Sequence, residues 1–287
     1  MRHLDGLHMW IISIASIILV LVGGFKLPDV KCKLLHSRNN LESSYAMHSS
    51  RLHASLLDSS NDARVTIGPY NILAFAAPLT DKAYVATDPS TISLYDVKSG
   101  WGNGAHPTTK LCLAFILKHV QPGHIVLDYG TGSGILSILA AKQGARCIAV
   151  DIDEDSLLAC RDNAKANGVS VEVVHTRSVY VGGDLPLADC TVANILPGAL
   201  NRLSSVLLML TRPGGVIALS GIRPEQLGAI QRIYGPYVDM NSQQTTQQSH
   251  DIYGEWVLWS AMTRVLGEEE KQQLRDKLST ASVEECH

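Results

Sequence analysis

The run from Asp128 to Gly134, Asp-Tyr-Gly-Thr-Gly-Ser-Gly, places three glycines at alternate positions behind a carboxylate. It follows the apolar residues 125–127, which predict a buried strand, and precedes residues 135–142, which predict a helix. Glycines at such a junction let the backbone turn sharply, and without a Cβ they let a ligand lie against the main chain. The stretch predicts a cradle for a cofactor. A tight turn without a ligand is the alternative, which the flanking sequence must decide.

The spacing of the glycines narrows the choice of cofactor. A dinucleotide fingerprint, G-x-G-x-x-G, needs its third glycine at position 135, where this chain has Ile135. The observed G-x-G-x-G behind an acid suits S-adenosylmethionine, which carries an ammonium and a carboxylate but no pyrophosphate. We therefore expect Gly130, Gly132 and Gly134 to bind this methyl donor, and Asp128 to meet its ammonium directly or through water.

A second carboxylate, Asp151, follows the apolar residues 147–150. At the carboxyl end of a second strand, a carboxylate can accept hydrogen bonds from the 2′ and 3′ hydroxyls of an adenosine ribose. Capping of the next helix is the alternative role, but Asp153 and Asp155 are available for it. We assign Asp151 to the ribose and place Ile152 beside it in the donor site.

Asn194 ends the next predicted strand but one and is the candidate catalytic residue. Methyl transfer to an amine needs a lone pair, and holding a lysine neutral at pH 7 costs about 4.6 kcal/mol, from a reference pKa near 10.4. An apolar surrounding lowers this cost, and the Asn194 side-chain oxygen can orient the amine, with the Ile195 or Leu196 carbonyl as second acceptor. A strand-end cap or a contact to the cofactor alone is the alternative for Asn194.

A glycine-rich loop, residues 101–109, leads into a predicted helix at 110–120. Pro107 suits a helix start, and Thr108 and Thr109 can offer hydroxyls at its exposed amino end. His106 is interpreted as a loop residue that closes over the donor. A role as catalytic base is the alternative, since the pKa of histidine lies near neutrality.

The main part of the chain alternates between strand and helix patterns, which predicts an α/β fold with a doubly wound, mostly parallel, seven-stranded sheet. The carboxyl ends of its strands are where a ligand binds, and Gly130, Asp151 and Asn194 all fall there. The predicted strands are 125–127, 147–150, 169–174, 187–193, 216–220, 238–241 and 252–262. The predicted helices after the glycine-rich loop are 110–120, 135–142, one capped by Asp155 or Ser156 that ends near 166, 199–210 and 223–234, with a turn at 213–215.

We expect this main domain to span residues 99–264. Residues 63–98 contain short alternating runs at 65–67, 70–76 and 83–86, which predict a small β element with too few strands for a core of its own. Residues 265–287 form a polar tail that begins with a predicted helix at 268–278.

Two segments precede the β element. Within residues 1–25, the apolar run at 9–25 spans about 25 Å as a helix, less than the roughly 30 Å of a bilayer core, which favours a signal peptide over a membrane anchor. Residues 26–62 are Ser-rich, basic and poor in acids, which predicts a disordered leader or linker. This pair resembles the two-part leader of algae with complex plastids, so a plastid location is favoured. Mitochondrial, secretory and membrane-anchored locations are the alternatives, and membrane contact is expected only if residues 9–25 remain uncleaved.

The formal net charge of −3 argues against a broad nucleic-acid-binding surface. The cysteines form no C-x-x-C pair and lie mostly in apolar segments, which favours small buried side chains in a reducing compartment over disulfides or zinc ligands. We expect no metal site. The six cysteines are Cys32, Cys112, Cys147, Cys160, Cys190 and Cys286.

Four motifs together resemble the bacterial PrmA family, whose members methylate amino groups of large-subunit ribosomal protein eleven. Its patterns F-G-T-G-x-H-x-T-T, D-x-G-x-G-S-G, D-I-D and A-N-I-L-x-G are similar to residues 101–109, 128–134, 151–153 and 193–198. The resemblance implies a Rossmann-like class I methyltransferase that uses S-adenosylmethionine to modify lysine or amino groups of a ribosomal protein or a similar protein. It also implies that Thr109 contacts the donor, together with the glycine cradle, the ribose carboxylate and Asn194.

The chain also departs from that family. Trp101 stands where the family has Phe, Asn103 where it has Thr, and Pro197 where it often has Ala. The family has a separate amino-terminal domain that grips the ribosomal protein, whereas residues 1–62 show no ferredoxin-like pattern. Two alternatives therefore stay open: a small-molecule N- or O-methyltransferase with a closed apolar pocket over Asn194, and a non-catalytic donor-binding protein.

Overall fold

The computed structural model of the 287-residue chain describes residues 63–75, 88–95, 102–180 and 185–284. These residues all belong to one compact unit, His53–His287. The predictions for residues 1–25 and 26–62 lie outside the described residues. Within the described ranges, no helix is both long enough and apolar enough to cross a membrane.

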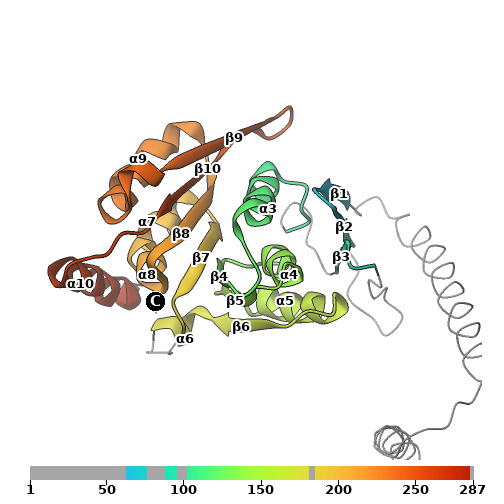
Figure 1. Ribbon diagram of the computed structural model, residues 1–287, viewed down its shortest axis with the longest axis horizontal. Helices are drawn as coiled ribbons and strands as arrows, with labels where there is room; N and C mark the ends of the chain where they lie inside the picture. Colours follow the sequence, from blue (N-terminus) through green and yellow to red (C-terminus); the bar gives the residue numbers. More distant parts are fainter. Residues whose placement is uncertain (1–62, 76–87, 96–101, 181–184, 285–287) are drawn as a thin grey trace, which may run out of the picture. The chain divides into compact units, whose positions relative to one another are not determined.

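The central element is a seven-stranded sheet with the strand order β6-β5-β4-β7-β8-β10-β9 (Figure 1). Strands β4 to β8 are parallel, and β10 runs antiparallel to both of its neighbours. The predicted doubly wound, mostly parallel sheet is therefore confirmed. Its strands are β4 (Ile125–Tyr129), β5 (Arg146–Asp151), β6 (Val171–His175), β7 (Ala188–Asn194), β8 (Thr211–Ile222), β9 (Gln244–His250) and β10 (Gly254–Met262).

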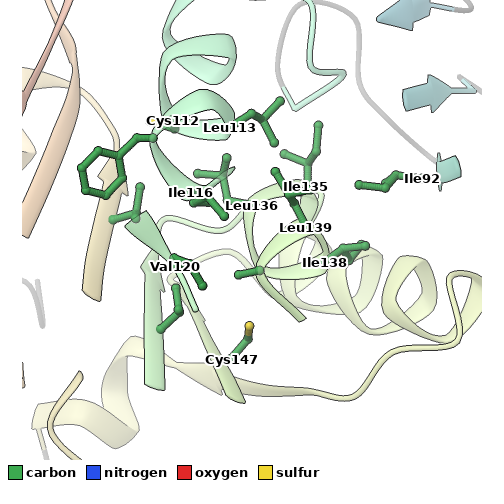
Figure 2. Packing of buried hydrophobic residues seen from close by; sticks show 14 of the residues in the cluster. Ile92, Cys112, Leu113, Ile116, Val120, Ile135, Leu136, Ile138, Leu139 and Cys147 are labelled. Atoms are coloured by element: carbon green, nitrogen blue, oxygen red, sulfur yellow. The ribbon is translucent and has the colours of Figure 1, made fainter. Parts of the chain in front are cut away.

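Helices pack on both faces of this sheet. Successive strand residues point to opposite faces, so Val126 and Val192 lie in one apolar cluster while Leu127 and Ala193 lie in the other. The first cluster contains side chains of α3 (Pro107–His119) and α4 (Ile135–Lys142), which Figure 2 shows packed together with Cys147 of β5. The remaining helices are α5 (Glu154–Ala166), α6 (Thr176–Tyr180), α7 (Pro197–Arg202), α8 (Ser204–Leu210), α9 (Leu227–Tyr234) and α10 (Glu268–Glu284).

The small β element is a separate three-stranded sheet of β1 (Ala63–Ile67), β2 (Tyr70–Ala74) and β3 (Thr91–Leu94). Ile72 and Ile92 are fully buried in the cluster formed with α3 and α4, and Figure 2 shows Ile92 beside α4. One face of the element therefore shares the core of the main domain, while Leu73, Phe75 and Tyr95 form a second small buried cluster with Ala166. The predicted strand at 83–86 lies outside the described residues. Strand β3 was not predicted, because it has only four residues.

The predicted turn at 213–215 lies inside β8 as an irregularity: the register with β7 shifts there, and Gly214 has a φ of +75°. Thr263 pairs with this segment: its carbonyl accepts from the Gly214 N–H, and its own N–H donates to the Gly215 carbonyl. The predicted helix at 199–210 is two helices that meet at Leu203, and the helix predicted at 223–234 starts with a 3-10 turn, Pro224–Gln226. Neighbouring backbone supplied the hydrogen bonds that local sequence did not indicate.

The strand predicted at 238–241 is also wrong. Val238 forms only an isolated bridge with Thr263, and a 3-10 turn follows at Met240–Ser242. The seventh strand is instead β9, whose sequence Gln-Thr-Thr-Gln-Gln-Ser-His has no apolar residue and which is largely exposed at the edge of the sheet. A strand with no buried face leaves no hydrophobic period to detect.

Candidate active site

The cradle joins β4 to α4 by a turn with three left-handed glycines. Gly130, Gly132 and Gly134 have φ values of +80°, +53° and +82°, a region that other residues rarely adopt. The turn is fixed to the neighbouring strand, because the N–H groups of Gly130 and Thr131 donate to the Val150 carbonyl at 2.8 and 3.1 Å. The structure confirms the predicted strand-glycine-helix junction.

The three glycines differ in what surrounds them. A Cβ at Gly130 would lie 2.3 Å from Cγ2 of Ile195, and one at Gly134 would lie 2.8 Å from Sγ of Cys160. A Cβ at Gly132 would meet nothing within 4 Å. Packing therefore requires the two outer glycines, whereas Gly132 faces open space in which a ligand can approach the backbone.

Asp128 lies beneath the cradle and is fully buried. Its Oδ2 accepts hydrogen bonds from the Thr131 hydroxyl at 2.8 Å and from the Ser137 hydroxyl and N–H at 2.8 and 3.2 Å. Burial raises the pKa of this carboxyl to about 6 despite these bonds. Its Oδ1 is buried and has no hydrogen-bond partner among the described residues, so this is the atom that the predicted contact with a donor ammonium would use.

Asp151 holds the cradle from the end of β5. Its Oδ2 accepts from the Gly132 N–H at 2.9 Å, and its Oδ1 accepts from the N–H groups of Ile152 and Asp153 at 2.8 and 3.1 Å. A carboxylate offers about four acceptor positions, so Asp151 can still accept from a ribose hydroxyl, and its contact with both hydroxyls stays a prediction. The cap of α5 is Asp153, not Asp155 or Ser156, and Asp151 is not needed for that role.

A pocket of about 310 Å³ opens at the carboxyl ends of β4 and β5. It brings together Gly130, Asp151 and Ile152, three of the predicted donor-binding residues. Ile152 is 63% exposed, so it offers an apolar surface at the rim. Thr176, Ala199, Arg202 and Leu203 also line the pocket but were not predicted, although Thr176 follows strand β6 and the same carboxyl-end rule identifies it. The remaining lining residues are Tyr129 and Ile195.

Asn194 and Thr109 meet, as expected for residues of one site. The side-chain nitrogen of Asn194 donates to the Thr109 hydroxyl at 3.4 Å. The side-chain oxygen of Asn194 is therefore the amide atom that does not face Thr109. The expectation that Thr108 and Thr109 lie at an exposed helix end is wrong, because their exposed fractions are 3% and 5%. Thr109 is therefore buried beside Asn194, and its contact with the donor stays a prediction.

The two backbone carbonyls proposed to assist Asn194 have different positions. The Leu196 carbonyl accepts from the N–H groups of Ala199 and Leu200, both at 3.0 Å, at the start of α7. The Ile195 carbonyl lies against Gly221, where a Cβ would approach it to 2.2 Å. The Leu196 carbonyl thus serves the helix, and the Ile195 carbonyl is packed against Gly221.

The glycine-rich loop lies against the cradle. The Ser133 hydroxyl donates to the Gly102 carbonyl at 2.7 Å. His106 is the N-cap of α3: its Nδ1 lies 2.8 Å from the Thr108 hydroxyl, and its ring centroid lies 4.9 Å from those of Tyr253 and Trp256. Burial lowers the pKa of His106, and its packing fits a loop residue better than a base.

The described cysteines are buried and free, and burial raises the pKa of the Cys160 and Cys190 thiols to about 12. This confirms the core assignment for Cys112, Cys147, Cys160 and Cys190; Cys32 and Cys286 lie outside the described residues. The described ranges contain no group of three or more His, Cys, Asp or Glu side chains arranged to hold a metal ion.

The sheet order, the cradle and the carboxylate after β5 define a class I methyltransferase fold. The family model for ribosomal protein L11 methyltransferase (PrmA) matches residues 77–261, so this chain belongs to that family. The cofactor of this family and fold is S-adenosylmethionine, which agrees with the open space at Gly132 and the unpartnered Asp128 oxygen.

Similar proteins include the ribosomal protein L11 methyltransferase of Pseudomonas paraeruginosa, 43% identical over 162 residues, which are 55% of this chain and 54% of that protein. The protein of the same name from Vibrio cholerae is 42% identical over 152 residues, 51% of this chain and 50% of that protein. The chain spans about half the length of these curated relatives. The crystal structure of a ribosomal protein L11 methylase from Lactobacillus delbrueckii subsp. bulgaricus is 26% identical, covers 72% of this chain and 100% of that chain, and has a TM-score of 0.55.

Proposed function

We propose that this protein transfers a methyl group from S-adenosylmethionine to an amino group of a ribosomal protein, with lysine side chains as the favoured acceptors. The observation that carries this proposal is the placement of Asp151, Gly132 and Asn194 at one edge of the sheet, with Asn194 held by buried Thr109. The names of the relatives support a ribosomal protein as the acceptor.

The donor supplies an activated methyl group bound to a sulfonium. The residues of this chain hold it: Asp151 accepts from a ribose hydroxyl, the open backbone at Gly132 lets the donor approach closely, and Ile152 covers an apolar part of it. Asp128 supplies a negative charge beneath the cradle, where an ammonium is attracted in a medium of low dielectric.

Asn194 orients the acceptor. Its side-chain nitrogen is committed to Thr109, so its oxygen is available for an N–H of the incoming amine, which directs the nitrogen lone pair toward the methyl group. The nitrogen forms its new bond to carbon as the carbon–sulfur bond breaks, and the proton leaves to water. Leu196, which is 66% exposed, offers an apolar surface that an incoming partner would cover, and burial of the amine there would disfavour its charged form.

The exposure of this edge supports a protein acceptor. Asn194 is only partly buried, and Leu196 beside it is largely exposed. The turn between β9 and β10 adds Ile252 and Tyr253, which are 83% and 40% exposed. An open surface of this kind accommodates a side chain that projects from a folded partner, whereas a small-molecule enzyme benefits from a closed pocket.

The test is incubation of the purified chain with donor labelled at the methyl group, together with purified large-subunit ribosomal proteins. We expect label in ribosomal protein L11 or a related subunit protein, and much less with Asn194→Ala. Label that appears only in small amines of an added extract would favour the small-molecule alternative. Tight donor binding without any transfer would favour a non-catalytic role.

We also propose a plastid location, on the basis of the apolar run at 9–25 and the Ser-rich, basic segment 26–62. A fluorescent protein fused after residue 62 tests this in an algal cell with complex plastids. Fluorescence inside the plastid is expected, whereas accumulation in the secretory pathway or in mitochondria would contradict the proposal.

A further inference from the structure

Two asparagines, Asn163 in α5 and Asn167 at its C-cap, lie one helical turn apart and are 0% and 5% exposed. Buried side-chain amides are stable only when their polar atoms are hydrogen-bonded. The partners of this pair lie in the small β element, about seventy residues earlier in the chain. The pair therefore joins two parts of the chain that are distant in sequence.

Each asparagine side chain bonds to the N–H and the carbonyl of a single residue in the segment that contains β3. Asn167 accepts from the Ser93 N–H at 2.9 Å and donates to the Ser93 carbonyl at 2.7 Å. Asn163 accepts from the Tyr95 N–H at 2.7 Å and donates to the Tyr95 carbonyl at 3.3 Å. Residues 93 and 95 point their backbone groups the same way, so the two amides replace a neighbouring strand at the free edge of β3.

The third hydrogen bond of each asparagine distinguishes the two. Asn167 donates to the Asn163 carbonyl at 2.7 Å, which lies within the same helix. Asn163 donates to the Ser133 carbonyl at 2.9 Å, which lies in the donor cradle. Since the Ser133 hydroxyl also donates to Gly102, Asn163 joins the β element to the cradle and its loop.

Apolar packing makes this junction stiff. Ile92 of β3 lies beside the α4 side chains Ile135 and Ile138 in the buried cluster (Figure 2). The loop passes between them and β2: a Cβ at Gly104 would lie 3.0 Å from Cδ1 of Ile135 and 3.5 Å from Cγ2 of Ile72. If the β element moves, its side chains therefore press on the loop as well as on the cradle.

We infer that Asn163 is a positioning residue that couples the β element, residues 63–95, to the donor cradle through the Ser133 carbonyl. This inference rests on the proposed donor site. Coupling between two sites is reciprocal, so a bound donor stabilises the attachment of Tyr95, and the attached β element raises donor affinity. The β element thereby becomes a means of tuning donor binding rather than a passive extension.

The test compares Asn163→Leu with Asn167→Leu, two substitutions of similar shape on the same helix. Each removes three side-chain hydrogen bonds, but only Asn163→Leu removes the bond to Ser133. Both should lower the melting temperature by similar amounts. Only Asn163→Leu should raise the Kd for S-adenosylmethionine, by about tenfold, because the Ser133 carbonyl is left unpaired. Equal donor affinities of the two variants would overturn the inference.

A second measurement uses the unmodified chain and decides the matter if Asn163→Leu does not fold. Hydrogen exchange followed by NMR resolves the Tyr95 N–H, bonded to Asn163, from the Ser93 N–H, bonded to Asn167. Saturating S-adenosylmethionine should slow exchange at Tyr95 more than at Ser93. Equal protection of the two amides with donor bound would contradict the coupling. Failure of the unmodified chain to bind donor would instead contradict the proposed function.

Discussion

The carboxyl edge of the sheet has two halves that are built differently. The donor half consists of backbone and buried or partly buried groups: the glycine turn, Asp128 beneath it and Asp151, which accepts from the Gly132 N–H of the turn. The acceptor half consists of side chains that are partly or largely exposed, with Asn194 beside Leu196 and the β9–β10 turn. Backbone conformation and burial hold the donor half, whereas the side chain of Asn194 in the acceptor half is held by a hydrogen bond to Thr109.

This difference matches what each half has to recognise. A small donor of constant shape can be recognised by a rigid backbone turn, whereas acceptors differ among proteins that share this fold. Substitutions in the donor half should therefore change stability and donor affinity together. Substitutions in the acceptor half should change turnover with little effect on stability.

The largest effect is expected from Gly130→Ala. The new Cβ would collide with Ile195 and would hold a left-handed backbone, which together cost about 2–5 kcal/mol of stability. Gly132→Ala is the matched control: it meets no neighbouring atom and should cost only about 1–2 kcal/mol, from its backbone conformation. Urea unfolding of both variants measures the difference. Equal losses would show that the two glycines are not packed differently.

The next effect concerns Asp128 and pH. Its pKa in the folded protein, about 6, exceeds the ordinary 3.8, so between these values the folded state keeps a proton that the unfolded chain has lost. This carboxyl therefore lowers the free energy of unfolding as pH rises through that window, by about 3 kcal/mol for a shift of about two units. Asp128→Asn removes this dependence. The variant should gain about 3 kcal/mol relative to the unmodified chain between pH 4 and pH 7.

Unfolding of both proteins in urea at a series of pH values measures this gain. A constant difference across the series would show that folding does not raise the pKa of Asp128. Donor affinity of Asp128→Asn at pH 7 adds a second result: a marked loss would support the contact between the Asp128 oxygen and the donor ammonium.

Asn194→Ala tests the acceptor half. We expect kcat to fall by about a hundredfold, because the variant no longer orients the amine, while donor affinity changes less than about threefold. Steady-state kinetics and calorimetric titration with S-adenosylmethionine separate the two quantities. Equal losses in turnover and affinity would move Asn194 into the donor half.

The smallest of these effects is expected from Asp151→Ala. Removing the carboxylate loses a ribose hydrogen bond and frees the Gly132 N–H, which should weaken donor binding between about ten- and hundredfold. Calorimetric titration of the variant gives the change in Kd. Unchanged affinity would remove Asp151 from the donor site.

The donor half could be predicted from the sequence because its signals are local. The glycines between β4 and α4 and the carboxylate after β5 each sit at a strand end with a recognisable neighbour sequence. The helix at Ile135–Lys142 was predicted with its observed boundaries for the same reason. The separate roles of the glycines could not be predicted, however. Only the packing shows that Gly130 is required for steric reasons, whereas Gly132 leaves space for a ligand to approach.

The remainder depended on distant contacts. Edge strand β9 has no apolar residue, and β8 continues through Pro213 because Thr263 satisfies its backbone groups. The hydrogen bonds of Asn163 and Asn167 to the β3 segment join residues about seventy positions apart, which no local pattern indicates. Burial of Thr109 likewise follows from packing around the start of α3.

The most direct test of the two-part edge is a crystal structure of this protein with S-adenosylhomocysteine, the demethylated donor. We expect a ribose oxygen within hydrogen-bonding distance of Asp151, the ligand backbone over Gly132, and the sulfur directed toward the side-chain oxygen of Asn194. A ligand bound elsewhere, or one whose sulfur points away from Asn194, would contradict the account.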